Sequence, residues 1–513
     1  MTRSVFSTID GSPVLGGRTM ASTNPAKLND VVGEVAYADA TTFVRAAESA
    51  SKAQQTWAAV PAPMRGRAIA HIGRLIEDNA EALARLVTSE IGKPYGEALG
   101  EVREIVDTCD FFLSEGRRLY GQTVPSEMPD KRLFTYRRPV GAVAVITAGN
   151  FPVAVPAWYI VPALVAGNSV VWKPAEYSAV TSAALHELFV RGGGLPGGVF
   201  NVVHADGVST FEGLQTALES GFIDKVGFTG SSAVGREIGA LTGRYLQTAC
   251  LELGGKNPLV IAPSADLDLA VEGALFSGFG TAGQRCTSLG TVIVHESIHD
   301  QFLAKFTAAV TGAKVGDPTA DVLMGPLLDA KFAERYEEIL SWIQPHHTVQ
   351  GSHGRITDEN PRDGFVGDPS DGLYYHPIVV DGVRADDRIF GEETFGPIVG
   401  VTTYDTMSRA IELANAPGYG LSSSIYTNDP KEAFTFQSKI SAGMVSINNS
   451  TSGAEAHLPF GGNGKSGNGS RQSGVWVLDQ FTRWQAVNWD YSGRLQKAQM
   501  DIVELTSDRD FRL

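Results

Sequence analysis

Apolar residues recur every three or four positions through the first part of the chain, between residues 40 and 118. The recurrence is clearest over 46–57, 65–89 and 101–118, where charged side chains occupy the positions in between. A spacing close to 3.6 residues places the apolar side chains on one face of a helix. The pattern therefore predicts amphipathic helices over these ranges, each with one face packed against a core.

From residue 140 onward, short continuous apolar runs alternate with helical patterns. One set includes VGAVAVIT, NSVVWKP and KVGFTG, and a second set begins at NPLVIA and continues to MVSINN. Apolar strands that alternate with helices indicate βαβ units and parallel sheets that are buried on both faces. Two such sets predict two α/β domains that face each other. The run LFTYRRP predicts a further extended strand, and the polar stretch 345–374 predicts a surface loop.

Length and charge restrict the function. The chain has 513 residues, more than one domain usually holds, and 42 Lys and Arg against 57 Asp and Glu, a formal charge of −15. An acidic protein disfavours nucleic acid and anionic membranes as partners, because both require a basic face. The sequence has no run of 18 apolar residues, no signal-peptide pattern at its start and only three cysteines. We therefore expect reduced thiols in a cytoplasmic protein.

Three polar side chains lie among glycines and small residues: Asn150 in TAGNFP, Glu252 in LELGGKNP and Cys286 in GTAGQRCTS. A thiolate attacks carbonyl carbon well, so Cys286 is a candidate nucleophile. Glu252 lies in an apolar run, where burial raises a carboxyl pKa toward neutrality and suits it to act as a general base. The amide of Asn150 can donate to a developing oxyanion, with the main-chain N–H of Cys286 as a second donor. The residues predict covalent thiol chemistry on a carbonyl compound, followed by hydrolysis of an acyl-enzyme.

Two other patterns do not predict a site. The run GGNGKSGNGS lacks the spacing of a phosphate-binding P-loop, because Pro459 stands where that pattern requires glycine. His346 and His347 lie in the polar loop without a cysteine or a spaced third ligand. We expect them to be exposed to solvent, and no metal site is predicted.

Together these segments resemble the NAD(P)-dependent aldehyde dehydrogenase superfamily over nearly the whole chain. LELGGKNP is similar to its glutamate signature and FGTAGQRCTS to its cysteine signature. FPVAVPAWYIVPALVAGNSVVWKPAE, VGFTGSSAVG, GEETFGPI and LPFGGNGKSG also match, in the same order. The resemblance implies a small-molecule aldehyde as substrate. It also implies a catalytic set with Cys286 as nucleophile, Glu252 as the base for deacylation, Asn150 as oxyanion donor, and Lys173.

The same resemblance implies an α/β fold in three parts. A Rossmann-like cofactor domain would comprise residues 1–119 and 141–253, and a second α/β catalytic domain would comprise 254–446. Residues 120–140 and 447–513 would form bridging segments, including a β-arm for oligomerisation. The aromatic-rich run WVLDQFTRWQAVNWDY near the C-terminus supports an interface, and a homodimer or homotetramer is expected.

The expected cofactor is NAD. The chain has no GxGxxG in a βα turn, and the resemblance explains this absence, because the family binds the pyrophosphate at a helix N-terminus after FTGS. The carboxylate of Glu176 would accept hydrogen bonds from a ribose 2′-hydroxyl and repel a 2′-phosphate, which favours NAD over NADP. By the resemblance, the cofactor contacts are Lys173, Glu176, Phe228, Gly230, Ser231, Glu393 and Phe395.

The substrate stays open at this stage. GEVREIVDTCDFF and TSGAEAHLPFGG resemble the antiquitin branch, the α-aminoadipate semialdehyde dehydrogenases, in which Glu104 and Arg285 would hold the amino-acid head group. The chain departs from that branch at Lys256, where the branch has asparagine, and over 289–291, where it has arginines. An amino-acid semialdehyde and another aliphatic or aromatic aldehyde are both candidates.

Two other functions are compatible with the same fold. An enzyme that transfers the acyl group to coenzyme A would be favoured if Glu252 were replaced, because this carboxylate activates water. A non-catalytic structural protein would be favoured by loss of Cys286, Glu252 or Asn150. All three residues are present, so we predict a hydrolytic, NAD-dependent aldehyde dehydrogenase.

Overall fold

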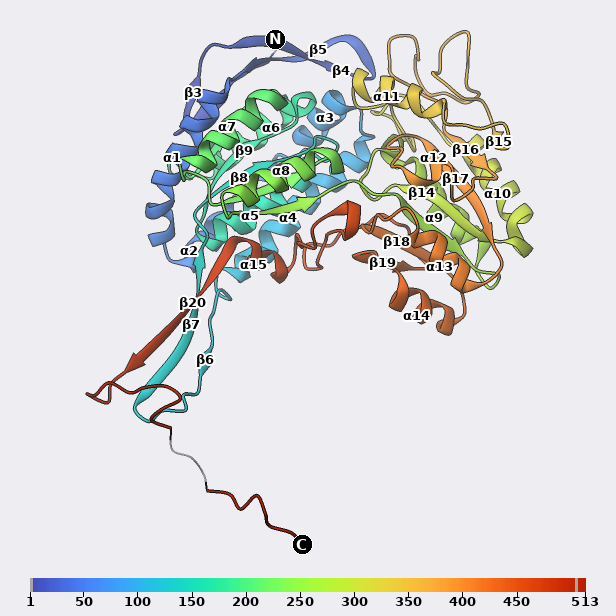
Figure 1. Ribbon diagram of the computed structural model, residues 1–513. Coiled ribbons are helices and arrows are strands. Elements are labelled where there is room, and N and C mark those ends of the chain that lie inside the picture. Colours follow the sequence, from blue (N-terminus) through green and yellow to red (C-terminus); the bar gives the residue numbers. More distant parts are fainter. Residues whose placement is uncertain (1–2, 503–505) are drawn as a thin grey trace.

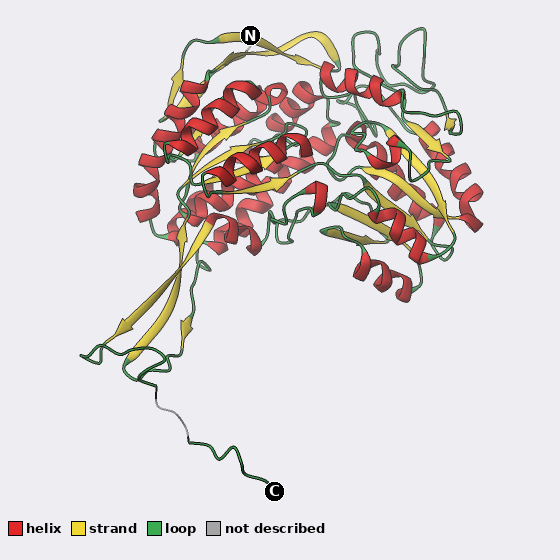
Figure 2. Ribbon diagram, in the orientation of Figure 1, coloured by secondary structure: helices red, strands yellow, loops and turns green. Residues whose placement is uncertain are grey.

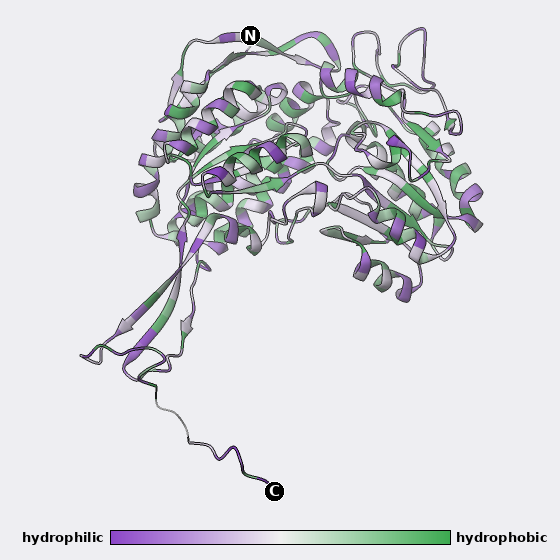
Figure 3. Ribbon diagram, viewed as in Figure 1, coloured by the Kyte–Doolittle hydropathy of each residue, from purple (hydrophilic) through white to green (hydrophobic). Residues whose placement is uncertain are grey.

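The computed structural model describes residues 3–502 and 506–513, and its strands form four sheets surrounded by helices (Figures 1 and 2). Two sheets have seven strands each, and two smaller sheets have three strands each. Figure 3 shows apolar residues along the strands of both large sheets, whereas the outer helices mix polar and apolar positions. The two α/β units expected from the sequence are therefore confirmed.

The predicted helices between residues 40 and 118 are present. The stretch 65–89 is divided at Asn79, whose backbone (φ −109°, ψ 11°) is not helical, so that two helices form there. The strands before residue 38 were not predicted from the sequence, because β1 to β3 have three residues each and β4 and the first half of β5 are mostly exposed. The elements of this part are β1 (Arg3–Val5), β2 (Ser7–Ile9), β3 (Ser12–Val14), β4 (Arg18–Asn24), β5 (Lys27–Tyr37), α1 (Ala40–Ala59), α2 (Ala62–Asp78), α3 (Ala80–Ile91) and α4 (Tyr95–Glu115).

The first large sheet has the order β12-β11-β8-β9-β10-β2-β3, and its first five strands are parallel. Alternate residues of β8 enter different cores: Val143 and Val145 pack with α2, α4 and α5, whereas Ala144 packs with α1, α7 and α8. Burial on both faces explains the continuous apolar runs in the sequence. The elements are β8 (Ala142–Ile146), α5 (Ala154–Ala166), β9 (Ser169–Lys173), α6 (Ala179–Glu187), β10 (Phe200–Val202), α7 (Gly207–Glu219), β11 (Lys225–Thr229), α8 (Ser232–Arg244) and β12 (Thr248–Glu252).

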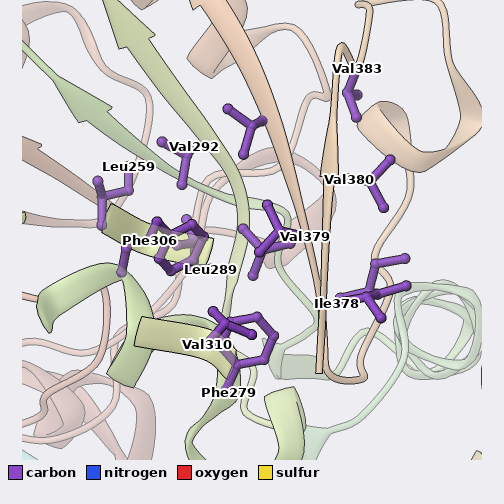
Figure 4. Close-up of a cluster of buried hydrophobic side chains, with 14 of the residues drawn as sticks. Leu259, Phe279, Leu289, Val292, Phe306, Val310, Ile378, Val379, Val380 and Val383 are labelled. Atoms are coloured by element: carbon purple, nitrogen blue, oxygen red, sulfur yellow. The ribbon is translucent and has the colours of Figure 1, made fainter. Parts of the chain in front are cut away.

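The second large sheet has the order β15-β16-β17-β14-β13-β18-β19, and only β15 is antiparallel to its neighbour. Leu259, Val292 and Phe306 belong to its buried core (Figure 4). The elements are β13 (Asn257–Ile261), α9 (Leu267–Phe279), β14 (Leu289–His295), α10 (His299–Gly312), α11 (Ala330–Leu340), β15 (Thr348–Gln350), β16 (Ile378–Asp381), α12 (Arg388–Gly391), β17 (Ile398–Tyr404), α13 (Met407–Asn415), β18 (Ser422–Tyr426), α14 (Pro430–Lys439) and β19 (Met444–Ile447).

A three-stranded arm projects from the first α/β unit (Figure 1). It consists of β6 (Thr123–Val124), β7 (Lys131–Pro139) and β20 (Thr482–Asp490), and β20 pairs antiparallel with β7 along its whole length. The strand predicted at LFTYRRP is therefore present. Before β20, the chain forms the short helix α15 (Leu478–Phe481). No helix in the described ranges is both long and apolar enough to cross a membrane.

Candidate active site

A cavity of about 840 Å³ lies between the two α/β units, at the carboxyl ends of β8, β9, β11 and β12. Its other wall comes from α11 and from the loop over 391–395. Ligands bind at this end of parallel sheets because loops and helix N-termini converge there. The lining includes nine of the predicted residues, namely Asn150, Lys173, Glu176, Phe228, Gly230, Ser231, Cys286, Glu393 and Phe395.

The wall formed by the first sheet carries groups of both charges. Lys173 ends β9, and its Nζ lies 3.0 Å from Oε1 of Glu176, whose side chain is 35% exposed. Ser231 caps α8, and its hydroxyl accepts a hydrogen bond from the N–H of Val234. The first N–H groups of a helix have no intrahelical partner, and the helix dipole favours an anion beside them. These groups fit a diphosphate at α8 and a ribose diol at Lys173 and Glu176.

The opposite wall presents Glu393 and Phe395. Oε1 of Glu393 accepts a hydrogen bond from the N–H of Gly255 at 3.0 Å, and burial raises the pKa of Glu393 to about 7. A Cβ atom at Gly254 would lie 1.9 Å from Oε2 of Glu393, so the close approach requires glycine. The ring of Phe395 packs on Phe332 with centroids 5.6 Å apart. This wall therefore offers a second carboxylate for a ribose and an apolar ring beside it.

Cys286 follows a tight left-handed turn. Thr281 and Ala282 have φ values of 51° and 53°, which cost non-glycine residues about 1–2 kcal/mol each. After the turn, the carbonyl oxygen of Cys286 accepts a hydrogen bond from Nδ2 of Asn257 at 2.9 Å. Strain of this kind persists only where surrounding contacts enforce it. The position of the thiol therefore depends on what holds this turn.

Burial and the carboxylates of Glu393 and Glu252 raise the pKa of Cys286 to about 12. The resting group is therefore a thiol, which needs a base before it attacks a carbonyl carbon. Glu252 ends β12 and is 3% exposed, and burial raises its pKa well above the ordinary value. Its carboxylate accepts hydrogen bonds from the N–H of Gly462 at 3.2 Å and the hydroxyl of Ser470 at 3.4 Å. A carboxyl whose pKa is raised holds a proton more readily than an ordinary glutamate, which suits a general base.

Asn150 lies between β8 and α5 and is buried. Its Nδ2 donates a hydrogen bond to the carbonyl oxygen of Gln284. The side chain of Gln284 is also buried, and its Oε1 accepts a hydrogen bond from the N–H of Leu328 at 3.0 Å. A primary amide has two N–H groups, so one remains for an oxygen atom bound at Cys286. The structure thus joins the predicted oxyanion donor to the nucleophile turn.

The two predicted head-group residues do not contact each other and lie outside the cavity lining. The guanidinium of Arg285 forms an ion pair with Glu97 and stacks on Phe276, 4.3 Å from the ring centroid. Oε1 of Glu104 is buried without a hydrogen-bond partner, and burial raises the pKa of Glu104 to about 8. The indole of Trp158 lies beside this carboxyl and packs on Phe460.

Sequence reasoning missed two acids of α4. Oε1 of Glu97 accepts a hydrogen bond from the N–H of Thr281 at 3.1 Å, and its other oxygen accepts from the Thr281 hydroxyl. One turn further, Oε1 of Glu101 accepts from the N–H groups of Val153 and Ala154 at 2.7 and 3.0 Å, and Oε2 pairs with buried Lys93. The available signal was three acids spaced by four and three residues on a helix that has one apolar face.

The histidine pair differs from the expectation. The side chain of His347 is fully buried, and Nε2 of His346 and of His347 lie 3.1 and 2.9 Å from Oδ2 of Asp387. These three residues could face a metal ion. However, Nδ1 of His347 accepts a hydrogen bond from the N–H of Gln344 at 2.9 Å, so the proton of a neutral ring is on Nε2. The pair therefore donates to Asp387, and burial of His347 corrects the prediction of exposure.

Comparison with known proteins gives the same picture over almost the whole chain. Residues 15–487 match the aldehyde dehydrogenase family. The alpha-ketoglutaric semialdehyde dehydrogenase of Bacillus subtilis is 36% identical, over 90% of this chain and 93% of that protein. Aldehyde dehydrogenase family 7 member A1 of Pisum sativum is 34% identical, over 96% and 95%. The predicted resemblance to the antiquitin branch is thereby confirmed.

Solved structures agree with this picture. The crystal structure of betaine aldehyde dehydrogenase from Staphylococcus aureus, in complex with NAD+, superimposes with a TM-score of 0.89. It is 30% identical and covers 96% of each chain. The similarity therefore includes both large sheets and the cavity between them.

Proposed function

Because the chain belongs to the aldehyde dehydrogenase family, we propose that it oxidises an aldehyde to a carboxylic acid through a thioester on Cys286, with NAD as the cofactor. The observation that carries this proposal is that the proposed catalytic and cofactor-binding residues line one cavity. One wall holds a cysteine beside an amide donor, and the other walls hold carboxylates and a helix N-terminus that suit a dinucleotide. The buried carboxyl of Glu252 acts electrostatically on the same cysteine.

NAD fits the donor set better than NADP. Glu176 supplies a carboxylate beside Lys173 at the rim of the cavity, where a ribose hydroxyl could donate to it. A 2′-phosphate there would face the negative charge of Glu176. The Staphylococcus aureus neighbour was solved with NAD+. When bound, the nicotinamide accepts the hydride that leaves the substrate carbon.

In the proposed mechanism, Cys286 gives up its proton to one of the two carboxylates that act on it, Glu393 or Glu252. Its sulfur then forms a bond to the aldehyde carbon. The second N–H of Asn150 and the main-chain N–H of Cys286 donate to the oxygen, which carries negative charge at that moment. After oxidation the acyl group is held as a thioester. Glu252 then removes a proton from water, the oxygen of that water attacks the acyl carbon, the carbon–sulfur bond breaks, and the leaving thiolate takes the proton from Glu252. The products are the acid and the free thiol.

The test is NADH formation from a panel of aldehydes by the wild-type protein and by Cys286→Ala. Cys250→Ser is the matched control, because Cys250 is buried and contacts Gln480 rather than the cavity. We expect activity to be lost in Cys286→Ala and kept in the control. Full activity of Cys286→Ala would remove the thiol mechanism. Transfer of the acyl group to coenzyme A at a rate above hydrolysis would favour the acylating alternative.

For the substrate, we propose a semialdehyde with an ammonium group, such as an amino-acid semialdehyde. The two buried cations near α4 already face carboxylates, Lys93 with Glu101 and Arg285 with Glu97. Oε1 of Glu104 has no hydrogen-bond partner. An ammonium group would stabilise the ionised form of this carboxyl by pairing with it. Trp158 lies beside Glu104 and packs on Phe460. Phe460 directly precedes Gly461 and Gly462, which lie beside Glu252, so this packing connects Glu104 to the proposed deacylation site.

A second candidate is an oxo-acid semialdehyde. Relatives named alpha-ketoglutaric semialdehyde dehydrogenase support it, and a protonated Glu104 could donate a hydrogen bond to a carboxylate. Comparing wild type with Glu104→Gln on aminoadipate semialdehyde, on an oxo-acid semialdehyde and on a plain aliphatic aldehyde separates the cases. A loss confined to the amino compound supports the first candidate. Equal losses on all three would remove the head-group role of Glu104.

We also propose a homo-oligomer, a dimer or tetramer, that is assembled through the arm. Trp484 and Trp489 on β20 are 54% and 62% exposed in the single chain, and exposed aromatic residues on a projecting strand suit an interface. Three free cysteines, two of them buried, support a reducing compartment such as the cytoplasm. We propose a domain boundary near residue 253, because β12 ends in the first large sheet and β13 begins the second, and a further boundary near residue 446, close to the end of β19.

A further inference from the structure

The residue that holds the strained turn before the nucleophile comes from a distant helix. Glu97 lies in the first turn of α4, and Thr281 and Arg285 lie more than 180 positions later. One carboxylate oxygen of Glu97 accepts from the main-chain N–H of Thr281, and the other accepts from the Thr281 hydroxyl and the Arg285 guanidinium. Three hydrogen bonds therefore join α4 to both ends of the turn that precedes Cys286.

Glu97 contacts the part of this turn whose backbone conformation is least favourable. Thr281 and Ala282 are successive non-glycine residues in the left-handed region, and Thr281 is also β-branched. Nothing in the residues themselves selects that conformation, so contacts from outside must enforce it. Glu97 binds the main-chain N–H of Thr281 itself. Nε of Arg285 also donates to the Thr281 hydroxyl at 3.3 Å, which closes the network across the turn.

The opposite charges of Glu97 and Arg285 favour one fixed arrangement of these two side chains. Arg285 is 6% exposed and faces Glu97 and the ring of Phe276. Although burial opposes ionisation, Arg285 and the Thr281 hydroxyl hold the pKa of Glu97 below its ordinary value, so it is a carboxylate at neutral pH. Removing its charge would leave a buried guanidinium without a partner, which is costly. The ion pair therefore locks Arg285, the residue directly before the nucleophile.

We propose that Glu97 is a positioning residue for the reaction: it holds the 281–285 turn in its left-handed form and thereby sets the place of the Cys286 thiol. Glu97 is not expected to touch the substrate or the cofactor. The inference deepens the proposed function and rests on Cys286 as the nucleophile. It also gives Arg285 a role in the turn, in place of a direct role in binding a substrate carboxylate.

The test compares Glu97→Gln, Glu97→Asp and Thr281→Ala with wild type by two readouts. The first is the rate of the NADH burst in single turnover, together with KM for the aldehyde. The second is alkylation of Cys286 by iodoacetamide, located by peptide mass, in the absence of aldehyde and cofactor. The second readout does not depend on the proposed function. If the wild-type protein oxidises no aldehyde, that function fails, but alkylation still tests the positioning role.

For Glu97→Gln we expect the burst to slow by about tenfold or more, with KM changed less than threefold, because small displacements of a reacting group are costly. We also expect alkylation to become at least threefold faster, since a relaxed turn no longer holds the partly exposed thiol in one position. Thr281→Ala, which keeps the main-chain hydrogen bond, should show smaller changes in the same directions. Glu97→Asp retains the charge and should lie between Glu97→Gln and wild type.

Glu90→Gln is the matched control for a merely structural effect. Glu90 is also a buried acid, and its carboxylate accepts from the N–H groups of Val180 and Thr181 and from the Ser22 hydroxyl, in a different part of the chain. This variant should lower the melting temperature without changing Cys286 alkylation. The proposal is overturned if folded Glu97→Gln keeps both rates within twofold of wild type. If Glu97→Gln does not fold, unchanged rates in Glu97→Asp and Thr281→Ala overturn it equally.

Discussion

Nδ2 of Asn150 lies 2.9 Å from the carbonyl oxygen of Gln284, two residues before Cys286. This hydrogen bond orients the amide from the first α/β unit against the turn that carries the nucleophile in the second. The proposed oxyanion donor is therefore fixed to the main chain two residues before the proposed nucleophile. The bond also leaves a single N–H of the amide for the oxygen of the substrate.

Asn150→Ala should lower kcat by about 10²–10³-fold, the usual cost of one oxyanion donor. KM should change much less, because the oxygen carries its charge mainly in the transition state. Steady-state kinetics with one aldehyde measure both constants. Asn150→Asp is the companion variant: it has the same size but an acceptor in place of the N–H, and it should lose at least as much. A change in KM alone would contradict the assignment.

Glu252→Gln should separate the two halves of the reaction. A glutamine cannot accept a proton from water, so the thioester should accumulate. Rapid mixing should show a burst of NADH close to one per active site, followed by turnover at least about 10²-fold slower than wild type. Mass spectrometry of the quenched protein should then find the acyl group on Cys286. A variant without the burst would place Glu252 in the activation of the thiol instead.

The hydrolytic step should also depend on pH in a defined direction. Burial raises the pKa of Glu252 above its ordinary value, so the carboxyl is protonated over a wider range at low pH. Only the ionised form removes a proton from water. The deacylation rate of the wild type should therefore rise with pH through that elevated pKa and then level off. Single-turnover acid release, measured at a series of pH values, checks the direction.

The pH dependence of KM should reveal the charge of the head group. Burial raises the pKa of Glu104 to about 8, so in the free protein most of it is protonated at pH 7. An ammonium-bearing aldehyde pairs with the ionised form, and its KM should fall as pH rises toward 8, by up to about tenfold per unit. An aldehyde without a head group should show no such slope. Glu104→Gln should flatten the profile, and a KM that rises with pH would favour an oxo-acid substrate.

Glu176→Gln should shift the cofactor preference. The substitution removes the carboxylate that repels a 2′-phosphate and frees Lys173, whose Nζ lies 3.0 Å from Glu176, to meet that phosphate. We expect kcat/KM with NADP to rise by about tenfold and that with NAD to fall, as the hydroxyl acceptor becomes weaker. Glu187→Gln, which removes an exposed carboxylate paired with Arg191, is the control. Unchanged ratios would remove Glu176 from cofactor selection.

Trp489→Glu should weaken assembly. Trp489 is 62% exposed on β20 of the arm, and a charge there would have to be buried in an interface. Light scattering after size exclusion should show a smaller mass than wild type at equal concentration. Leu246→Glu controls for a new charge at an exposed apolar residue away from the arm, because Leu246 is 93% exposed. Loss of mass in both variants would not support the arm as the specific contact.

Much of the fold followed from the sequence because burial on both faces leaves a direct trace. Strands such as β8 and β9 are fully buried, so nearly every residue is apolar or small, Lys173 at the end of β9 excepted, and the runs were visible. The strands before residue 38 could not be found in this way, because β3 and β4 are largely exposed and their residues face few constraints.

The candidate catalytic residues could also be identified from the sequence, because a cysteine, an asparagine and a glutamate stood out among glycines. The residues that hold them in place could not be identified in this way. Glu97 and Glu101 look like ordinary helix acids, and only the fold shows that each accepts hydrogen bonds from a main-chain N–H of the site. The ion pair between Glu97 and Arg285 could not be found from the sequence, because the two positions are 188 residues apart. Such partners are set by tertiary contacts, which carry no local pattern.

The raised pKa of Cys286 has a consequence outside the catalytic cycle. Because its pKa is raised to about 12, nearly all of the idle sulfur is thiol and not thiolate at pH 7. Peroxides and other electrophiles oxidise the thiolate and not the thiol, so the idle protein resists oxidative inactivation. Vulnerability would be confined to the brief interval in which the sulfur is charged.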